Sequence, residues 1–183
     1  MVRVYNLIKK WVKQMSGRVI VYTGDGQGKT TASLGVAMRS VAHGKKVVVI
    51  QFMKGRKDTG EYLIKNVFPG NYEIYQFGRE EFVDLRNPSD EDKRLARKGL
   101  DFAREKMREK PFLLILDEIN IASHFNLVSV DDVISLVREK PDETNLVLTG
   151  RYADKRLIEV ADMVTEVREV KRKKVECVEG IEF

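Results

Sequence analysis

Apolar residues along this chain gather into short continuous runs, and the stretches between the runs repeat apolar residues at helical spacing. Continuous runs are typical of strands buried on both faces of a sheet, whereas helical spacing is typical of helices packed on that sheet. The runs predict strands at residues 18–22, 46–52, 73–76, 112–116, 145–149 and 163–169. The spacing predicts helices at residues 28–43, 60–66, 89–110, 120–126, 129–139 and 154–160. This alternation predicts an α/β fold with a mostly parallel sheet and helices on both faces.

The amino-terminal residues 1–16 predict a short amphipathic helix, because their apolar side chains recur at helical spacing between lysines. These lysines interrupt the continuous apolar stretch that a secretory signal requires. No other apolar run approaches the roughly 18–20 residues of a membrane span. We therefore expect a cytoplasmic protein that does not contact a membrane. With 183 residues and no repeat or linker-like stretch, the chain is expected to form one domain, residues 1–183.

The charge of the chain suits an anionic partner, either a small anionic substrate or nucleic acid. Lysine and arginine (33) outnumber aspartate and glutamate (28), which gives a formal net charge of +5. Part of this excess is the basic run Lys171–Lys174, which we interpret as solvated surface rather than as a nucleic-acid contact. Cys177 is the single cysteine, so no disulfide can form within the chain, and we interpret it as a structural thiol.

A glycine-rich segment between the first strand and the next helix carries the clearest chemical signal. Residues 23–30 read Thr-Gly-Asp-Gly-Gln-Gly-Lys-Thr, close to the phosphate-loop pattern G-x-x-x-x-G-K-[ST] but with Thr23 as the first residue. Glycines let backbone N–H groups point at phosphate oxygens, and the following helix adds the positive end of its dipole. A glycine-rich turn without a ligand is the alternative. The residues expected to hold the triphosphate of ATP are Gly24, Asp25, Gly26, Gln27, Gly28, Lys29, Thr30 and Thr31.

Two acidic residues at the end of the most apolar strand extend this interpretation. Asp117 and Glu118 directly follow four apolar residues, as at a Walker-B strand end. Carboxylate and hydroxyl oxygens suit Mg²⁺, so Thr30, Asp117 and Glu118 are the expected ligands of Mg²⁺ or Mn²⁺. The alternative is that the two acidic residues only mark the end of the strand and bind no metal. Together the two motifs predict a P-loop NTPase-like domain in which Lys29 contacts the outer phosphates.

Further polar residues follow other strands, at the edge of the sheet where ligands bind in such folds. Gln51 and Lys54 come at and after the end of the second strand, and we expect both to contact a bound ligand. Arg151 follows the fifth strand and is expected to reach phosphate or ribose. His43 and His124 have no second His or Cys at metal-ligand spacing, so we interpret both as structural.

Ordered blocks of sequence across about residues 18–183 resemble the ATP:corrinoid adenosyltransferases, the P-loop type of cob(I)alamin adenosyltransferase. Such a series of blocks is far more specific than a phosphate loop alone. The matching blocks are residues 21–35, 37–39, 43–45, 49–55, 116–120, 148–151 and 157–166, followed by Val170-Lys171 and Gly180-Ile181.

The resemblance implies transfer of the 5′-deoxyadenosyl group of ATP to a reduced corrinoid, whose Co(I) attacks the ribose 5′ carbon and displaces triphosphate. It implies that Lys29, Thr30 and Glu118 are catalytic, because they and the bound metal stabilise the leaving triphosphate. No general base is needed, since Co(I) carries no proton. Arg39 also matches a family position and is a candidate ligand contact, with a structural ion pair as the alternative.

The resemblance also implies where the corrinoid lies. In the family, an aromatic stretch after the third strand covers the corrinoid and helps to displace its lower ligand. Here that stretch reads Phe77-Gly-Arg-Glu-Glu-Phe82, so Phe82 and also Phe77 are candidate corrinoid contacts, with positions in the core as the alternative. The amino-terminal helix either folds over the active site or packs on the sheet. A homodimer and an electron-donating reductase are the implied partners.

Two other functions also fit the phosphate loop. The first is a kinase or ATPase that cleaves ATP at the γ-phosphate and releases ADP instead of triphosphate. The second is a nucleic-acid-associated ATP-binding module that uses the basic run, with binding that falls steeply as salt rises.

Overall fold

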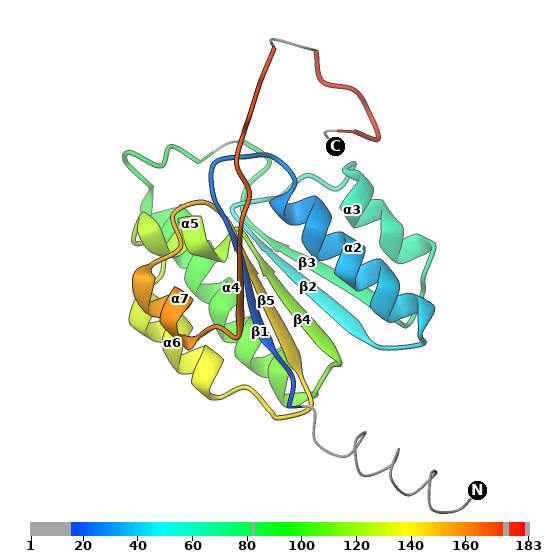
Figure 1. Ribbon diagram of the computed structural model, residues 1–183. Helices are drawn as coiled ribbons and strands as arrows, with labels where there is room; N and C mark the ends of the chain where they lie inside the picture. Colours follow the sequence, from blue (N-terminus) through cyan, green and yellow to red (C-terminus); the bar gives the residue numbers. More distant parts are fainter. Residues whose placement is uncertain (1–15, 82, 174–175, 182–183) are drawn as a thin grey trace, which may run out of the picture.

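Six parallel strands form one sheet in the computed structural model, which describes residues 16–81, 83–173 and 176–181 (Figure 1). Their order across the sheet is β3-β2-β4-β5-β1-β6, and every neighbouring pair is parallel. The predicted α/β fold is therefore confirmed. The strands are β1 (Val19–Thr23), β2 (Val47–Phe52), β3 (Tyr72–Phe77), β4 (Leu113–Asp117), β5 (Asn145–Thr149) and β6 (Met163–Glu166).

Helices cover both faces of this sheet (Figure 1). One face carries α2 (Lys29–Ala42), α3 (Gly60–Leu63) and the 3₁₀ turn η1 (Ile64–Asn66). The opposite face carries α4 (Asp90–Arg108), α5 (Ile119–His124), α6 (Val130–Arg138) and α7 (Lys155–Val160). No described helix is both long enough and apolar enough to cross a membrane.

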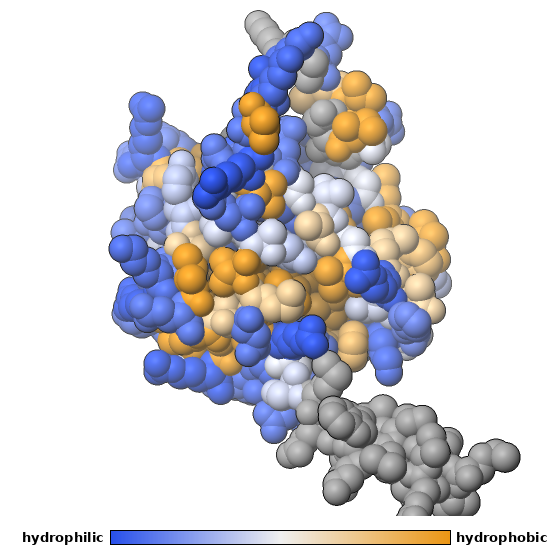
Figure 2. All heavy atoms as spheres, viewed as in Figure 1, coloured by the Kyte–Doolittle hydropathy of each residue, from blue (hydrophilic) through white to orange (hydrophobic). Residues whose placement is uncertain are grey.

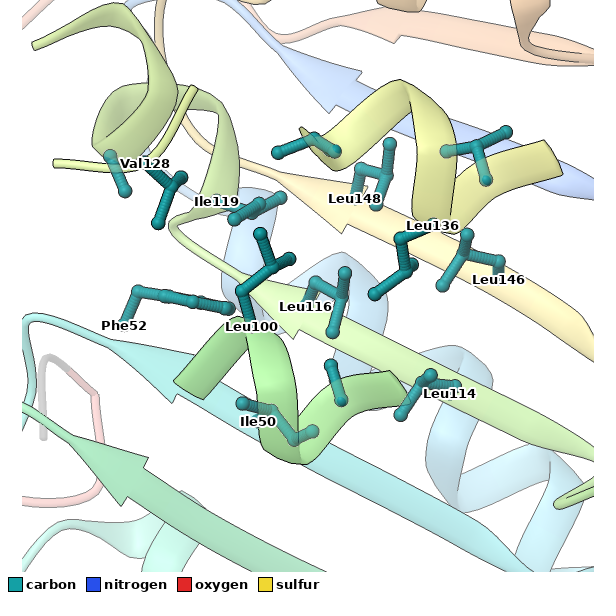
Figure 3. Packing of buried hydrophobic residues seen from close by; sticks show 14 of the residues in the cluster. Ile50, Phe52, Leu100, Leu114, Leu116, Ile119, Val128, Leu136, Leu146 and Leu148 are labelled. Atoms are coloured by element: carbon teal, nitrogen blue, oxygen red, sulfur yellow. The ribbon is translucent and has the colours of Figure 1, made fainter. Parts of the chain in front are cut away.

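The larger hydrophobic core lies between the sheet and the second group of helices. Ile50 of β2 and Leu116 of β4 point from the sheet toward Leu100 of α4 (Figure 3). A Cβ atom on Gly99 would lie only 3.0 Å from the side chain of Phe77, so α4 packs closely on the strands at this glycine. This close packing fixes the strand ends, where the polar residues predicted to bind ligands are found.

The observed elements begin and end within two residues of the predicted ones, apart from the last strand. That strand ends at Glu166 rather than at residue 169. Its neighbour β1 ends at Thr23, which pairs with Glu166, so the residues after Glu166 have no partner strand. Val167 instead donates a backbone hydrogen bond to Thr23 and accepts one from Gly26. The helix predicted within residues 1–16 lies outside the described residues, except for Ser16.

Candidate active site

The phosphate-loop residues lie at the carboxyl end of β1, where the chain turns into α2. Gly24 and Gly28 have positive φ angles of 98° and 104°, a conformation that glycine adopts readily. A Cβ atom on Gly24 would lie 2.3 Å from the carbonyl oxygen of Val167, whereas the space around Gly28 is open. The Gly26 N–H donates to the same Val167 carbonyl at 2.9 Å. The segment after β6 therefore packs directly against the loop.

Alanine at position 24 is expected to destabilise the protein by about 1–3 kcal/mol and to weaken ATP binding, because both the φ angle and the contact with Val167 exclude a side chain. Gly35→Ala is the matched control, since Gly35 lies within α2 in open space. Alanine there should stabilise the helix by up to about 1 kcal/mol. Calorimetry measures the effects on stability, and equal melting temperatures of the two variants would contradict the prediction.

Lys29 and Thr30, the first two residues of α2, lie against this loop. The Lys29 side chain is buried, and its ammonium group donates to the Gly26 carbonyl oxygen at 2.5 Å. Burial lowers the pKa of Lys29, although the nearby carboxylate of Glu118 acts in the opposite direction. A cation held this far from water interacts strongly with phosphate oxygens.

Asp117, the last residue of β4, is fully buried and accepts four side-chain hydrogen bonds. Its Oδ1 atom accepts from the hydroxyl groups of Thr30 (2.8 Å) and Thr149 (2.7 Å). Its Oδ2 atom accepts from Gln51 (3.0 Å) and from the ammonium group of Lys54 (2.9 Å). Burial alone would raise the pKa of Asp117, but the Lys54 charge and these donors hold it below its usual range. One ionised carboxylate thus joins α2, β2 and β5.

Glu118 differs from Asp117 in its surroundings. It precedes α5 with a positive φ of 66°, and its backbone N–H donates to the Thr149 hydroxyl oxygen at 3.0 Å. Burial and the neighbouring Asp117 charge raise the pKa of Glu118. Its side chain lines the same cavity as Lys29 and Arg151. A cation bound in that cavity would therefore favour the ionised form of Glu118.

The residues expected to hold Mg²⁺ offer oxygen ligands of a suitable kind. The Thr30 hydroxyl group lies 2.8 Å from the Asp117 carboxylate, and Glu118 follows directly. Within the described part of the chain, no three His, Cys, Asp or Glu side chains gather into a metal-binding group. The protein would then supply few ligands while phosphate and water supply the rest, which is the mode of binding that Mg²⁺ favours. The donor set therefore fits Mg²⁺ bound together with a nucleotide.

A cavity of about 460 Å³, here named the phosphate-loop cavity, lies beside the loop. Its polar lining consists of the loop and of charged side chains that follow β2, β4 and β5. Its apolar lining, which we name the apolar wall, consists of Phe52, Met53, Val83, Leu85 and Ile121. A second cavity of about 510 Å³ lies beside Gly24 and Asp25, is lined mainly by polar residues and shares Arg151 with the first.

Most of the predicted ligand residues come together around these cavities. Gly24 and Asp25 line the second cavity, and Thr31 lines a smaller one of about 280 Å³ beside α3. Gln51 and Asp117 are buried and linked by a hydrogen bond. The predicted residues that line the phosphate-loop cavity are Gly26, Gln27, Gly28, Lys29, Thr30, Lys54, Glu118 and Arg151.

Two predicted contacts lie elsewhere. Arg39 is exposed in the last turn of α2, ten residues after Lys29 and therefore about 15 Å along the helix, so the structure does not bring it to the phosphate loop. Phe77 packs against Phe102 of α4 with ring centroids 5.4 Å apart, so the core alternative holds for this residue. Phe82 lies outside the described residues.

Several residues of the site were not expected as contributors, among them Thr149 and the apolar wall. Thr149 joins Asp117 to the backbone of Glu118 through one hydroxyl group. Its place at the end of a predicted strand was a usable signal, because parallel strands end at the same edge of the sheet. Val83 and Leu85 of the apolar wall gave no signal, because they lie in the irregular segment between β3 and α4.

The phosphate loop after β1 and the buried aspartate at the end of β4 define a P-loop nucleotide-binding protein. More specifically, the chain belongs to the ATP:corrinoid adenosyltransferase family: the family described as ATP:corrinoid adenosyltransferase BtuR/CobO/CobP matches residues 15–183. The corrinoid adenosyltransferase of Sinorhizobium sp. is 40% identical over 173 residues, which cover 91% of this chain and 80% of the relative. That of Escherichia coli K12 is 32% identical over 156 residues, with coverages of 85% and 78%. Corrinoid adenosyltransferase CobA of Salmonella typhimurium is 31% identical over 157 residues, with the same coverages.

Family membership confirms the resemblance found in the sequence. It supports an adenosyltransferase that uses ATP and a corrinoid, in preference to a kinase or ATPase and to a nucleic-acid-associated module.

Proposed function

We propose that the phosphate-loop cavity is where this protein transfers the 5′-deoxyadenosyl group of ATP to the Co(I) centre of a corrinoid. The observation that carries the proposal is the mixed lining of this cavity, which combines the phosphate loop with the apolar wall. The loop suits the triphosphate, and the apolar wall offers contact area to a large macrocyclic ligand.

In the reaction, the electron pair of Co(I) forms a bond to the ribose C5′ atom. The C5′–O bond breaks, and its electron pair leaves with the triphosphate. Because no proton moves, the protein acts through position and charge rather than through a general base. We assign to Lys29 and the loop N–H groups the stabilisation of the leaving triphosphate. Arg151, which borders both cavities, adds a second positive charge.

We propose that Thr30, Asp117 and Glu118 hold Mg²⁺, directly or through water, and that Mn²⁺ can replace it. The metal would neutralise part of the triphosphate charge when bound. Lys54 already neutralises Asp117 at 2.9 Å, and the Asp117 charge raises the pKa of Lys54 against the opposing effect of burial. The carboxylate is thereby kept ionised and in place before the metal arrives.

The test is a product analysis. Incubation with ATP, Mg²⁺ and chemically reduced cobalamin should give the light-sensitive spectrum of an alkylcobalamin and an equal amount of inorganic triphosphate. Absorbance before and after illumination measures the first product, and ion chromatography separates triphosphate from ADP. Omitting the reductant is the control. Formation of ADP without a cobalt–carbon product would refute the proposal.

The single-domain organisation, the homodimer, the reductase partner and the cytoplasmic location remain proposals. The edge strand β6 supports a homodimer, since Met163 and Val164 are 46% and 41% exposed and apolar residues gather across the middle of this face (Figure 2). Sedimentation equilibrium tests it, and a monomeric mass at micromolar concentration would refute it. Cell fractionation tests the location.

A further inference from the structure

Residues 79–89, here named the wall segment, lead from β3 to α4 and carry two residues of the apolar wall, Val83 and Leu85. The described residues of this segment form no helix or strand before α4 begins at Asp90. Val83 and Leu85 are partly buried against the larger core. Without a hydrogen-bonded ladder, the place of the wall segment depends on this packing and on how its two ends are held.

A single carboxylate holds both of these ends. Asp92, in the first turn of α4, is only 4% exposed. It accepts hydrogen bonds from Nε and Nη2 of Arg79 at 3.0 and 3.3 Å. It also accepts from the backbone N–H and the hydroxyl group of Ser89 at 3.0 and 2.6 Å. Since Arg79 is the first residue of the wall segment and Ser89 is the last, Asp92 closes the segment into a loop.

The Arg79 end is also fixed to the polar lining of the phosphate-loop cavity. A Cβ atom on Gly78 would lie 2.3 Å from the backbone nitrogen of Lys54, and one on Gly55 would lie 2.6 Å from the carbonyl of Arg79. The two backbones are therefore in direct contact at glycine positions. Lys54 in turn binds Asp117. The arrangement connects the wall segment to the residues proposed to hold the metal.

A helix cap alone does not account for the Arg79–Asp92 pair. Asp92 and Ser89 form a capping box, which satisfies the first turn of α4 without any arginine. The Arg79 guanidinium group reaches across 13 residues of sequence and binds the same carboxylate with two N–H groups. Its side chain does not line the phosphate-loop cavity. An effect of the Arg79 side chain on the reaction is therefore indirect, and the wall segment is the part of the cavity lining that Arg79 and Asp92 hold.

We propose that Arg79 and Asp92 are positioning residues for the corrinoid, because their ion pair sets the place of Val83 and Leu85 in the apolar wall. This role rests on the proposed function of the phosphate-loop cavity. It implies that breaking the ion pair weakens the binding of the corrinoid and leaves the binding of ATP nearly unchanged.

Arg79→Gln should raise the KM for cob(I)alamin by about tenfold while the KM for ATP stays within about twofold, as expected for the loss of one hydrogen-bonded ion pair beside one substrate. Arg79→Lys keeps the charge but loses the paired N–H groups, so its KM should be intermediate. Arg94→Gln is the matched control. Arg94 forms a similar two-bond pair with Glu91 in the same turn of α4, but it is exposed and does not contact the wall segment.

Trypsin provides a readout of the wall segment itself. Cleavage after Arg86 should be faster in Arg79→Gln than in the parent or in Arg94→Gln, while the thermal midpoint stays within a few degrees because the capping box is retained. An unchanged KM for cob(I)alamin, or an equal rise in both KM values, would overturn the positioning role alone. A parent protein that forms no cobalt–carbon product would overturn the proposed function and this role with it.

Discussion

Replacement of Lys29 by alanine is expected to lower kcat/KM by about 10²–10³-fold, the usual loss when one preorganised electrostatic contact to a developing negative charge is removed. The structure supports a large effect for three reasons. The ammonium group is buried, it is held by the loop carbonyl of Gly26 at 2.5 Å, and it lines the phosphate-loop cavity. Water cannot replace it without a change in the loop.

Steady-state formation of adenosylcobalamin measures this effect, and titration with inorganic triphosphate shows whether the affinity for the leaving group falls with it. Lys98→Ala is the control, because Lys98 is an exposed lysine on α4. The same loss of charge there should leave activity within about twofold, as surface substitutions away from the site usually do. A Lys29→Ala variant with parent-level activity would show that this loop does not hold the triphosphate.

The fold could be predicted from the sequence because its central strands are apolar on both faces. All six residues of β2 are buried, and all five of β4 are buried up to Asp117. Such runs occur in few structures other than a parallel sheet covered by helices. The end of β6 could not be predicted in this way, since it depends on where β1 turns into the phosphate loop.

The candidate site was predictable where one local segment carries the chemistry. Lys29 and Thr30 follow the loop directly, and Asp117 ends a strand, so the parallel topology brings the Thr30 hydroxyl group to 2.8 Å from the Asp117 carboxylate. Contacts between segments far apart in sequence left no such signal. Gly24 is required partly by the approach of Val167, which the sequence pattern of the loop does not reveal.

Alternation along a strand explains why Phe77 takes the core position that the sequence left open as an alternative. Phe77 continues the alternation of Tyr75, and both rings pack against Phe102 of α4. The face of β3 that meets α4 is decided by the order of strands in the sheet, which the sequence does not state. The apolar wall instead draws on Val83 and Leu85 from irregular backbone, where periodicity carries no information.

Asp117→Asn is expected to reduce kcat/KM by about 10³-fold or more and to lower the free energy of unfolding by about 3–5 kcal/mol. The two effects have separate causes. Activity falls because the proposed metal loses a carboxylate ligand. Stability falls because Lys54, which lies 2.9 Å from Asp117, keeps only the longer ion pair with Glu61 at 3.5 Å. The new amide N–H groups would also face the donors that now bind this carboxylate.

The double variant Asp117→Asn/Lys54→Met separates these causes. Removing both charges should restore most of the lost stability, since a buried pair replaced by uncharged groups carries little net penalty, whereas activity should stay low. Denaturant titration and Mg²⁺-dependent product formation measure the two quantities. Asp131→Asn is the control, because Asp131 pairs with Arg156 at the surface. If the double variant regained activity together with stability, Asp117 would be a structural partner of Lys54 and not a metal ligand. Recovery of stability alone would show that the ammonium group of Lys54 accounts for the lost stability.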